Sequence, residues 1–189
     1  FCPMMLQMRG MATHRDAEPL HLYLTDKAFD IVPYLREDTP VIKGNVPKLE
    51  KDGVIQFHQL QFGEETEIAG FRVLPLRGNH MGSMGENSAN YLLTSAKGKT
   101  LYYGLDTGWY LPDTFQALAG RHIDIFVTEC TFGLTPNMDR HPGGHLHAFA
   151  LLELLDVLRK QGTVDENTQV FATHINHWTS NHQQLAEYF

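Results

Sequence analysis

Short apolar runs that end at polar side chains constrain the fold of this sequence more than any other feature. The three clearest runs cover residues 71–76, 100–105 and 170–173. Such runs, bounded by polar or glycine-rich segments, are typical of β-strands. His80 follows the first run and a turn, Asp106 follows the second, and His174 follows the third. Because a side chain just beyond a strand is held by the sheet but faces open space, we expect these three residues to converge at one sheet edge.

Length and composition bound the class of protein. The chain has 189 residues, which suffices for one sizeable domain, and we expect a single domain over residues 1–189. Its longest apolar stretch is interrupted by Glu153 and Asp156, so we expect no membrane-spanning helix and no membrane partner. Its net charge is −7 and its positive side chains are scattered, which argues against a general nucleic-acid-binding surface. Cys2 and Cys130 have no C-x-x-C spacing, which favours a reducing, cytoplasmic compartment.

The remaining pattern predicts further elements around these runs. Strands are expected over residues 21–25, 53–60 and 67–76. Helices are expected over residues 3–10, 26–35, 145–161 and 180–188, the last with Ser180 as its N-cap. Polar segments rich in proline or glycine predict loops over residues 36–50 and 131–144.

His80 and Asp106 each have a structural alternative to a functional role. His80 lies between Gly78 and Gly82, whose flexibility can bring the imidazole to a site, whereas a lone loop histidine is usually solvated. Asp106 follows a buried strand, where a carboxylate needs a cation or a helix N-terminus nearby. It is therefore either a metal-bridging carboxylate or the cap of a helix that begins near Trp109.

The segment 173–177, Thr-His-Ile-Asn-His, is the strongest single element. Its two histidines, His174 and His177, point roughly the same way if the chain turns helical there. Glu129 also ends an apolar run, and we assign it a capping or supporting role. Cys130 is either a nucleophile near His145 or, as its apolar flanks favour, a buried inert thiol. Other catalytic signatures, such as G-x-S-x-G, G-x-G-x-x-G and G-x-x-x-x-G-K-[ST], are absent from the sequence.

Taken in order, these motifs resemble the metallo-β-lactamase-fold hydrolases. The resemblance lies in the strand before His80, in Asp106-Thr107-Gly108, in Thr128-Glu129, in the helix after Gly144-His145 and in the segment 173–177. Within that superfamily the chain is most similar to the phosphodiesterase branch. That branch includes the cyclic ribose-phosphate phosphodiesterase of phosphonate breakdown and, more distantly, the tRNA 3′-processing endonuclease.

The resemblance implies an α/β fold, a metallo-β-lactamase-type αββα sandwich, with two divalent metal ions at one edge. The ions would be zinc, with manganese as the alternative. The resemblance further implies that His80 ligates the first metal and His174 the second, and that Asp106 bridges both and takes part in catalysis. His177 matches a position near the substrate phosphate, where it would donate a proton. His145 matches a weaker, loop-borne histidine that contacts substrate.

One hallmark of that superfamily, His-x-His-x-Asp-His, is absent from the sequence. It supplies most of the metal ligands and normally precedes a helix like the one expected over residues 3–10. We therefore expect a chain that is incomplete at its N-terminus, and also at its C-terminus, since such folds usually close with another strand. Tight zinc sites use three or four protein ligands. We therefore expect this chain alone to hold zinc weakly.

The sequence thus predicts a metal-dependent hydrolase, most specifically a phosphodiesterase for a small-molecule or nucleotide phosphodiester. In such an enzyme two divalent ions lower the pKa of a bridging water, and the resulting hydroxide attacks phosphorus in line. Two alternatives stay open. One is a metallo-hydrolase of a thioester, lactone or β-lactam, and the other is a non-catalytic, metal-free binding module of the same fold. The sequence also leaves open whether the chain forms a homodimer.

Overall fold

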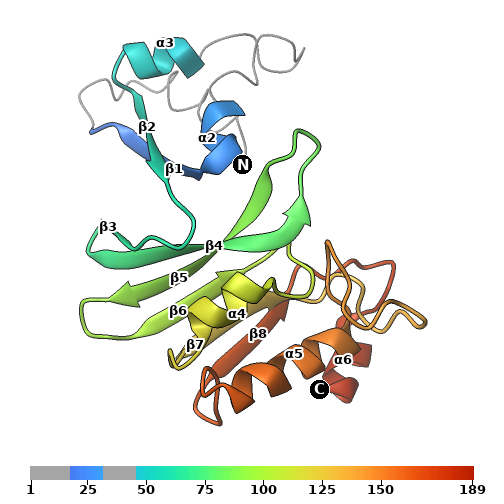
Figure 1. Ribbon diagram of the computed structural model, residues 1–189. Coiled ribbons are helices and arrows are strands. Elements are labelled where there is room, and N and C mark those ends of the chain that lie inside the picture. Colours follow the sequence, from blue (N-terminus) through green and yellow to red (C-terminus); the bar gives the residue numbers. More distant parts are fainter. Residues whose placement is uncertain (1–17, 32–45) are drawn as a thin grey trace. The chain divides into compact units, whose positions relative to one another are not determined.

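The computed structural model describes residues 18–31 and 46–189, which fall into two compact units, Phe1–Gln61 and Phe62–Phe189 (Figure 1). Cys2 and the helix expected over residues 3–10 lie outside the described residues. That the whole chain forms a single domain stays a prediction. Within the described ranges, no helix is both long enough and apolar enough to cross a membrane.

The described part of the first unit forms a small parallel sheet and two short helices. Its elements are β1 (Leu20–Thr25), α2 (Asp26–Ile31), α3 (Val46–Lys51) and β2 (Ile55–Leu60). β1 pairs with β2 in parallel, and parallel strands need a crossover connection such as the one that holds these helices. The helix α3 lies in a segment that we expected to be a loop because of its prolines. Pro47 is tolerated there because an N–H in the first turn of a helix has no intrahelical partner.

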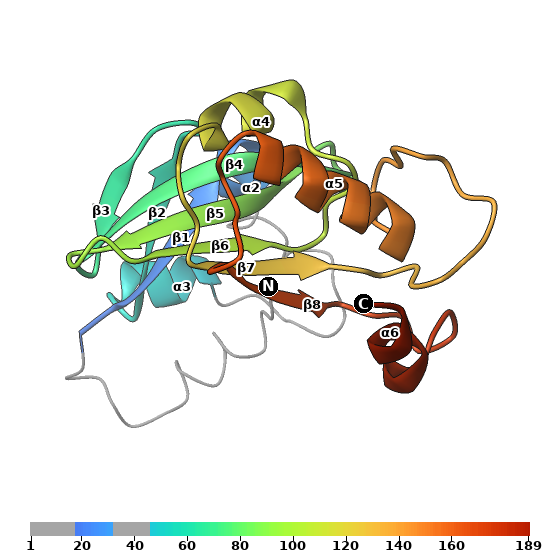
Figure 2. The same ribbon diagram turned by 90° about the horizontal axis from the view of Figure 1, so that it is seen from below.

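The second unit contains a six-stranded sheet in the order β3-β4-β5-β6-β7-β8 (Figures 1 and 2). The strands are β3 (Thr66–Ile68), β4 (Phe71–Met81), β5 (Asn87–Ser95), β6 (Thr100–Gly104), β7 (Ile125–Glu129) and β8 (Gln169–Thr173). β3 to β6 pair antiparallel through short turns. β6, β7 and β8 pair in parallel, with α4 (Pro112–Leu118) and α5 (Ala148–Lys160) in the two crossovers.

Strand direction brings four strand ends to one edge of this sheet. β5 is antiparallel to both β4 and β6, so β4 runs in the same direction as β6, β7 and β8. The carboxyl ends of all four strands therefore lie at the same edge. In open sheets of parallel strands, ligands bind outside this edge. The topology thus gathers the residues that end these four strands.

The core lies between the sheet and the helices α4 and α5, which cover the same face (Figures 1 and 2). The helices contribute leucines that are almost completely buried: Leu118, Leu151, Leu154 and Leu158. The sheet contributes Leu74, Leu92, Tyr102 and Phe126 to the same cluster. The leucine spacing that predicted a helix over residues 145–161 therefore marks the buried face of α5. Packing of this core holds the sheet rigidly, so that the residues at its strand ends are held in fixed positions.

The structure corrects the expected boundaries around His80. The region expected as one strand over residues 67–76 is two strands, because Ala69 and Gly70 form a tight turn at positive φ (50° and 81°). The strand β4 then continues past Leu76 to Met81, and its register with β5 shifts between Arg77 and Met81. His80 is therefore the penultimate residue of a strand rather than a residue beyond a turn.

Two further expectations about the C-terminal part are wrong. The apolar run 170–173 predicts a buried strand, but all residues of β8 are exposed, and β8 is the edge of the sheet among the described strands. The last helix is α6 (His182–Tyr188), and its N-cap is Asn181, whose side chain accepts a hydrogen bond from the Gln184 N–H. The expected cap, Ser180, instead accepts a hydrogen bond from the Leu134 N–H.

Candidate metal centre

The side chains of His80, Asp106, His145 and His174 converge at the carboxyl edge of the sheet. Asp106 Oδ1 lies 3.2 Å from His174 Nε2. One ligand atom each from His80, Asp106 and His145 lie within 4.8 Å of one another. The convergence that we expected of His80, Asp106 and His174 is therefore present, and His145 joins them.

His145 lies between the other two imidazoles. Its ring centroid is 4.8 Å from that of His80, at an interplanar angle of 60°. It is 5.5 Å from that of His174, and these two rings are nearly parallel, at 24°. Three imidazoles and a carboxylate thus surround a small volume. Imidazole nitrogens and carboxylate oxygens are the ligand types that zinc accepts.

Behind this cluster lies Glu129, a completely buried carboxylate at the end of β7. It accepts hydrogen bonds from two backbone N–H groups, at 2.6 Å from Thr107 and 3.1 Å from Leu146. It also accepts one from the Thr131 hydroxyl at 2.6 Å. Its oxygens lie 3.1 Å from His145 Nδ1. A buried carboxylate is stable only with such partners, and here they come from three separate chain segments.

These contacts separate the role of Glu129 from that of Asp106. Glu129, His145 and His174 also have ligand atoms within 4.8 Å of one another, so a metal could in principle use the buried carboxylate. The oxygens of Glu129 are already occupied by hydrogen-bond donors, however, whereas Asp106 is exposed. Since Glu129 accepts from His145 Nδ1–H, the other ring nitrogen of His145 is left as an acceptor. Carboxylates orient metal-ligating histidines in this way, which fits the supporting role expected for Glu129.

The loops that carry these residues are joined by backbone hydrogen bonds. The carbonyl of Asn79 accepts from the N–H groups of Gly144 at 2.7 Å and Gly108 at 3.3 Å. The Thr107 hydroxyl accepts from the Asn79 N–H at 2.9 Å. A Cβ atom on Gly108 would lie 2.2 Å from the Pro142 carbonyl oxygen, so only glycine fits at this crossing. The loop around His145 is therefore held against the ends of β4 and β6.

Asp106 and His174 share an unusual backbone conformation. Both have positive φ, 49° and 54°, although neither is glycine. Aspartate and histidine adopt this left-handed conformation more readily than most residues, and here it turns the chain just beyond the ends of β6 and β8. The helix α4 begins at Pro112, and its N-cap is Leu111, with no side-chain cap bond. Of the two alternatives for Asp106, the helix cap is therefore wrong.

The remaining histidines of this unit lie in other surroundings. His147 is the N-cap of α5: its Nδ1 accepts from the Ala150 N–H, and its Nε2 donates to the Asp139 carbonyl. His141 stacks on Trp109, with ring centroids 3.8 Å apart. His147 thus serves the start of α5, and His141 packs on an aromatic ring, so neither belongs to the convergent group.

His177 is exposed, and its ring lies 5.0 Å from that of Trp178. Among the residues that the structure describes, it belongs to neither group of candidate ligands. Its assignment as the catalytic acid stays a prediction. The same holds for the metal-binding roles of His80, Asp106 and His174 and for the substrate contact of His145.

The thiol of Cys130 is completely buried. Burial raises the pKa of this thiol to about 11, so the reactive thiolate is scarce near neutral pH. This supports the buried inert thiol over the nucleophile.

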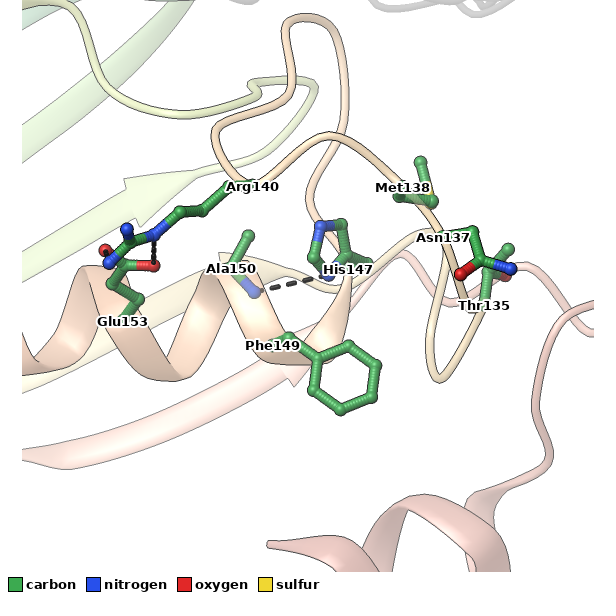
Figure 3. A pocket seen from close by; sticks show the side chains of 8 residues that line it. All are labelled: Thr135, Asn137, Met138, Arg140, His147, Phe149, Ala150 and Glu153. Atoms are coloured by element: carbon green, nitrogen blue, oxygen red, sulfur yellow. Dashed lines mark hydrogen bonds and ion pairs between the residues drawn. The ribbon is translucent and has the colours of Figure 1, made fainter.

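A pocket of about 210 Å³ lies between the loop before α5 and the start of that helix. Its lining residues are Thr135, Asn137, Met138, Arg140, His147, Phe149, Ala150 and Glu153. Figure 3 shows Arg140 directed toward Glu153, and its guanidinium nitrogens lie 2.8 and 2.6 Å from the carboxylate oxygens. This pairing holds the pKa of Glu153 down at about 2. None of the four convergent side chains lines this pocket, so it is separate from the candidate metal centre.

Sequence reasoning missed Asn79, Thr107 and Thr131 as parts of this site. Each lies one or two residues from a residue that the sequence did indicate: Asn79 precedes His80, Thr107 follows Asp106, and Thr131 follows Glu129 by two. The sequence feature that could have indicated these three residues is a small polar side chain close to a candidate site residue at the end of a strand. Which partner each would choose depends on loop crossings that the sequence pattern does not contain.

Comparison with known proteins places the fold. No protein-family model matches the chain, and no curated protein matches it in sequence. Among solved structures, unliganded yeast PDE1 matches 98% of this chain with a TM-score of 0.74 and 13% identity. The metallo-β-lactamase fold protein YhfI from Bacillus subtilis matches 88%, with a TM-score of 0.58 and 16% identity. The short form of human tRNase Z matches 86%, with a TM-score of 0.52 and 14% identity.

The matched regions are only parts of these proteins. The chain spans 58% of the length of yeast PDE1, 57% of YhfI and 63% of the human tRNase Z. The likeness is one of fold, since sequence identity is low throughout. With its mixed sheet, its two helices on one face and its polar residues at the carboxyl edge, the chain has the metallo-β-lactamase fold.

Proposed function

We propose that this chain carries part of the dinuclear metal site of a hydrolase that cleaves phosphodiesters. The observation that supports the proposal most is that three imidazoles converge with the exposed carboxylate of Asp106. Behind them lies the buried carboxylate of Glu129, whose oxygens already accept hydrogen bonds from the protein. Asp106 stays exposed beside His174, where a carboxylate that binds a metal has to be accessible.

The residues present fit divalent metal ions by their donor chemistry. In this proposal His80, His145 and Asp106 would hold one ion, and His174 would hold the other together with Asp106. Ring nitrogens of His145 and His174 that face away from Asp106 have protein partners, Glu129 and Thr131. Such partners fix the ring that a ligand presents to a metal. Zinc accepts imidazole and carboxylate together, and manganese is the alternative for a site richer in oxygen.

A pair of divalent ions bound there would supply Lewis acidity and a water whose pKa is lowered toward neutrality. The chain's own residues do the rest. Asp106, just beyond the end of β6, lies between the two proposed sets of ligands and contributes to both. The crossing of the loops at Gly108 keeps His145 in place. His177, exposed on the segment after His174, protonates the leaving oxygen.

The choice of a phosphodiester is supported by the fold neighbours. Human tRNase Z is a nuclease by its name, and nucleases cleave phosphodiester bonds. The substrate that we propose is a small-molecule or nucleotide phosphodiester. A thioester, lactone or β-lactam would use the same metals and stays as the second substrate class.

The test is hydrolysis of bis-p-nitrophenyl phosphate with added zinc or manganese. Because the chain spans about three fifths of the length of its fold neighbours, the assay is run on this chain and on any longer natural protein that contains it. We expect His174→Ala to abolish turnover and lower metal content. We expect His177→Ala to lower kcat by about 10²–10⁴-fold with metal content unchanged, as for a general acid.

The matched control is His182→Ala, which removes an exposed histidine on α6. It should change neither turnover nor metal content. Turnover of a p-nitrophenyl ester without turnover of the phosphodiester would favour the second substrate class. Neither turnover nor metal binding in any form of the protein would leave a metal-free binding module.

A further inference from the structure

Thr131 is a nearly buried residue that lies between the buried carboxylate and one of the convergent imidazoles. It is 8% exposed and follows β7 by two residues. Its hydroxyl oxygen lies 2.6 Å from Glu129 Oε2 and 2.7 Å from His174 Nδ1. Both distances are short for hydrogen bonds of their kind. The hydroxyl is therefore a link in a chain that runs from Glu129 to His174.

The direction of each hydrogen bond in this chain follows from the donors available. A hydroxyl has one proton, and an ionised carboxylate can only accept. Each oxygen of Glu129 already accepts a backbone N–H bond, Oε1 from Thr107 and Oε2 from Leu146, so this group acts as an acceptor and the Thr131 proton lies toward it. The Thr131 oxygen then has only lone pairs to offer His174. His174 Nδ1 must therefore carry a proton and donate it.

The other ring nitrogen of His174 is consequently the one that faces Asp106. His174 Nε2 lies 3.2 Å from Asp106 Oδ1. In a neutral ring with its proton on Nδ1, this nitrogen is an unprotonated acceptor. Two such acceptor atoms side by side offer a nitrogen and an oxygen ligand to a cation.

We propose that Thr131 is a positioning residue that fixes His174 in the Nδ1–H tautomer and so presents Nε2 to the candidate metal centre. Neutral histidine in water favours the opposite tautomer, with the proton on Nε2, so the protein must impose this one. The part that concerns metal rests on the proposed function. The tautomer itself does not, because it follows from contacts within the chain.

The proposal also gives Glu129 two tasks. It holds His145 directly, through Nδ1, and it holds His174 through the Thr131 hydroxyl. One buried carboxylate thus determines which ring nitrogen stays unprotonated in two imidazoles that come from different loops. Thr131 is the part of this arrangement that can be removed without changing the charge.

The test compares Thr131→Val, which keeps the shape but removes the hydroxyl, with Thr131→Ser, which restores it. The matched control is Thr163→Val. Thr163 is also buried, and its hydroxyl donates to the Leu118 carbonyl, away from the convergent side chains. All three proteins are compared with the unchanged chain by long-range ¹H–¹⁵N NMR of the histidine rings without metal. The spectra are recorded at about pH 9, above the ordinary imidazole pKa of about 6.5. Zinc affinity is measured separately by competition with a chelator.

We expect His174 to be the Nδ1–H tautomer in the unchanged chain, in Thr131→Ser and in Thr163→Val. In Thr131→Val the Nε2–H tautomer should appear, and zinc affinity should fall by about 10–100-fold, the usual effect of removing an outer partner of a ligand. An Nε2–H tautomer in the unchanged chain would overturn the proposal. So would a Thr131→Val variant that is folded and keeps both the tautomer and the zinc affinity.

The failure of this proposal and of the proposed function can be told apart. If the tautomer responds to Thr131→Val but no form of the protein binds zinc, the positioning role stands for His174 and the metal-dependent function fails. If zinc binds and phosphodiesters are cleaved but the tautomer is unaffected, only the role of Thr131 is overturned.

Discussion

Histidines come close together in both units of the chain, but in different surroundings. In the first unit His21 Nδ1 lies 2.6 Å from His58 Nε2, and His58 stacks on Tyr23 with ring centroids 4.6 Å apart. In the second unit His145 lies between His80 and His174. Within the described ranges, no third histidine, cysteine or carboxylate completes a group of ligands with His21 and His58. The cluster of the second unit has Asp106 in front of it and Glu129 behind it.

The difference shows that proximity of imidazoles does not by itself indicate a site. His21 and His58 lie within strands, on neighbouring positions of a sheet face, and each satisfies the other's ring nitrogen. His80, Asp106 and His174 lie at strand ends, where the loop that carries His145 converges on them. In His145 and His174 one ring nitrogen is held by Glu129 and by Thr131, respectively, which directs the other ring nitrogen toward the candidate metal centre. The position on the sheet and the buried support distinguish the two clusters.

Of the substitutions that test this difference between the two clusters, we expect Glu129→Gln to have the largest effect on zinc affinity and stability. The amide nitrogen of glutamine is a donor, and it would face N–H groups that now donate to Glu129. We expect zinc affinity to fall by about 10–100-fold and the free energy of unfolding to fall by about 1–3 kcal/mol. Chelator competition and urea unfolding measure the two effects.

The matched control for Glu129→Gln is Glu153→Gln. Glu153 is a partly exposed carboxylate on α5 that forms an ion pair with Arg140 in the preceding loop. It should leave zinc affinity unchanged. A Glu129→Gln variant with wild-type zinc affinity would mean that the buried carboxylate does not support the ligands, and the contrast between the two clusters would lose its basis.

An intermediate effect is expected from Gly108→Ala. The added Cβ would meet the backbone of residues 142–144, which cannot move away without shifting the loop that carries His145. Overpacking of this kind typically costs about 1–3 kcal/mol of stability. The control is Gly143→Ala in the same loop, whose Cβ would have its nearest contact at 3.9 Å. Thermal unfolding and zinc affinity of both variants test this; equal behaviour of the two would show that the crossing does not constrain the site.

The smallest effect is expected from His58→Asn in the first unit. It removes the partner of His21 but no residue of the candidate metal centre. Zinc stoichiometry and affinity should therefore stay as they are, measured by the same chelator competition. A drop in the amount of zinc bound would show that the His21–His58 pair is itself a zinc site, and proximity alone would then suffice.

The sheet that supports the site was largely predictable from the sequence. Its strands are short apolar runs, and the residues that follow them, Asp106 and His174, stand out as polar groups at strand ends. The leucine pattern of α5 predicted the helix that buries the sheet face. These features are local in sequence, so periodicity and punctuation suffice to find them.

The parts that escaped prediction depend on contacts between distant segments. His80 was placed after a turn because the shifted register of β4 has no sequence signature. β8 was expected to be buried because its residues are apolar, but only the strand order makes it an edge. The partners of Thr131 arise where three loops cross, and hydrogen-bonding residues such as threonine have many acceptable partners.

The strand ends at the carboxyl edge belong to segments that are far apart along the chain. Before folding, His80 and His174 are connected only by a long, flexible stretch, and bringing such ends together costs conformational entropy. The pairing of β6, β7 and β8 in parallel is a non-local step of the kind that slows folding. Ions held at these two ends and linked through Asp106 would act as a cross-link between β4 and β8. The energy of binding would then be part of the energy of folding. The strand β8, which among the described strands pairs with β7 alone, would gain most from it.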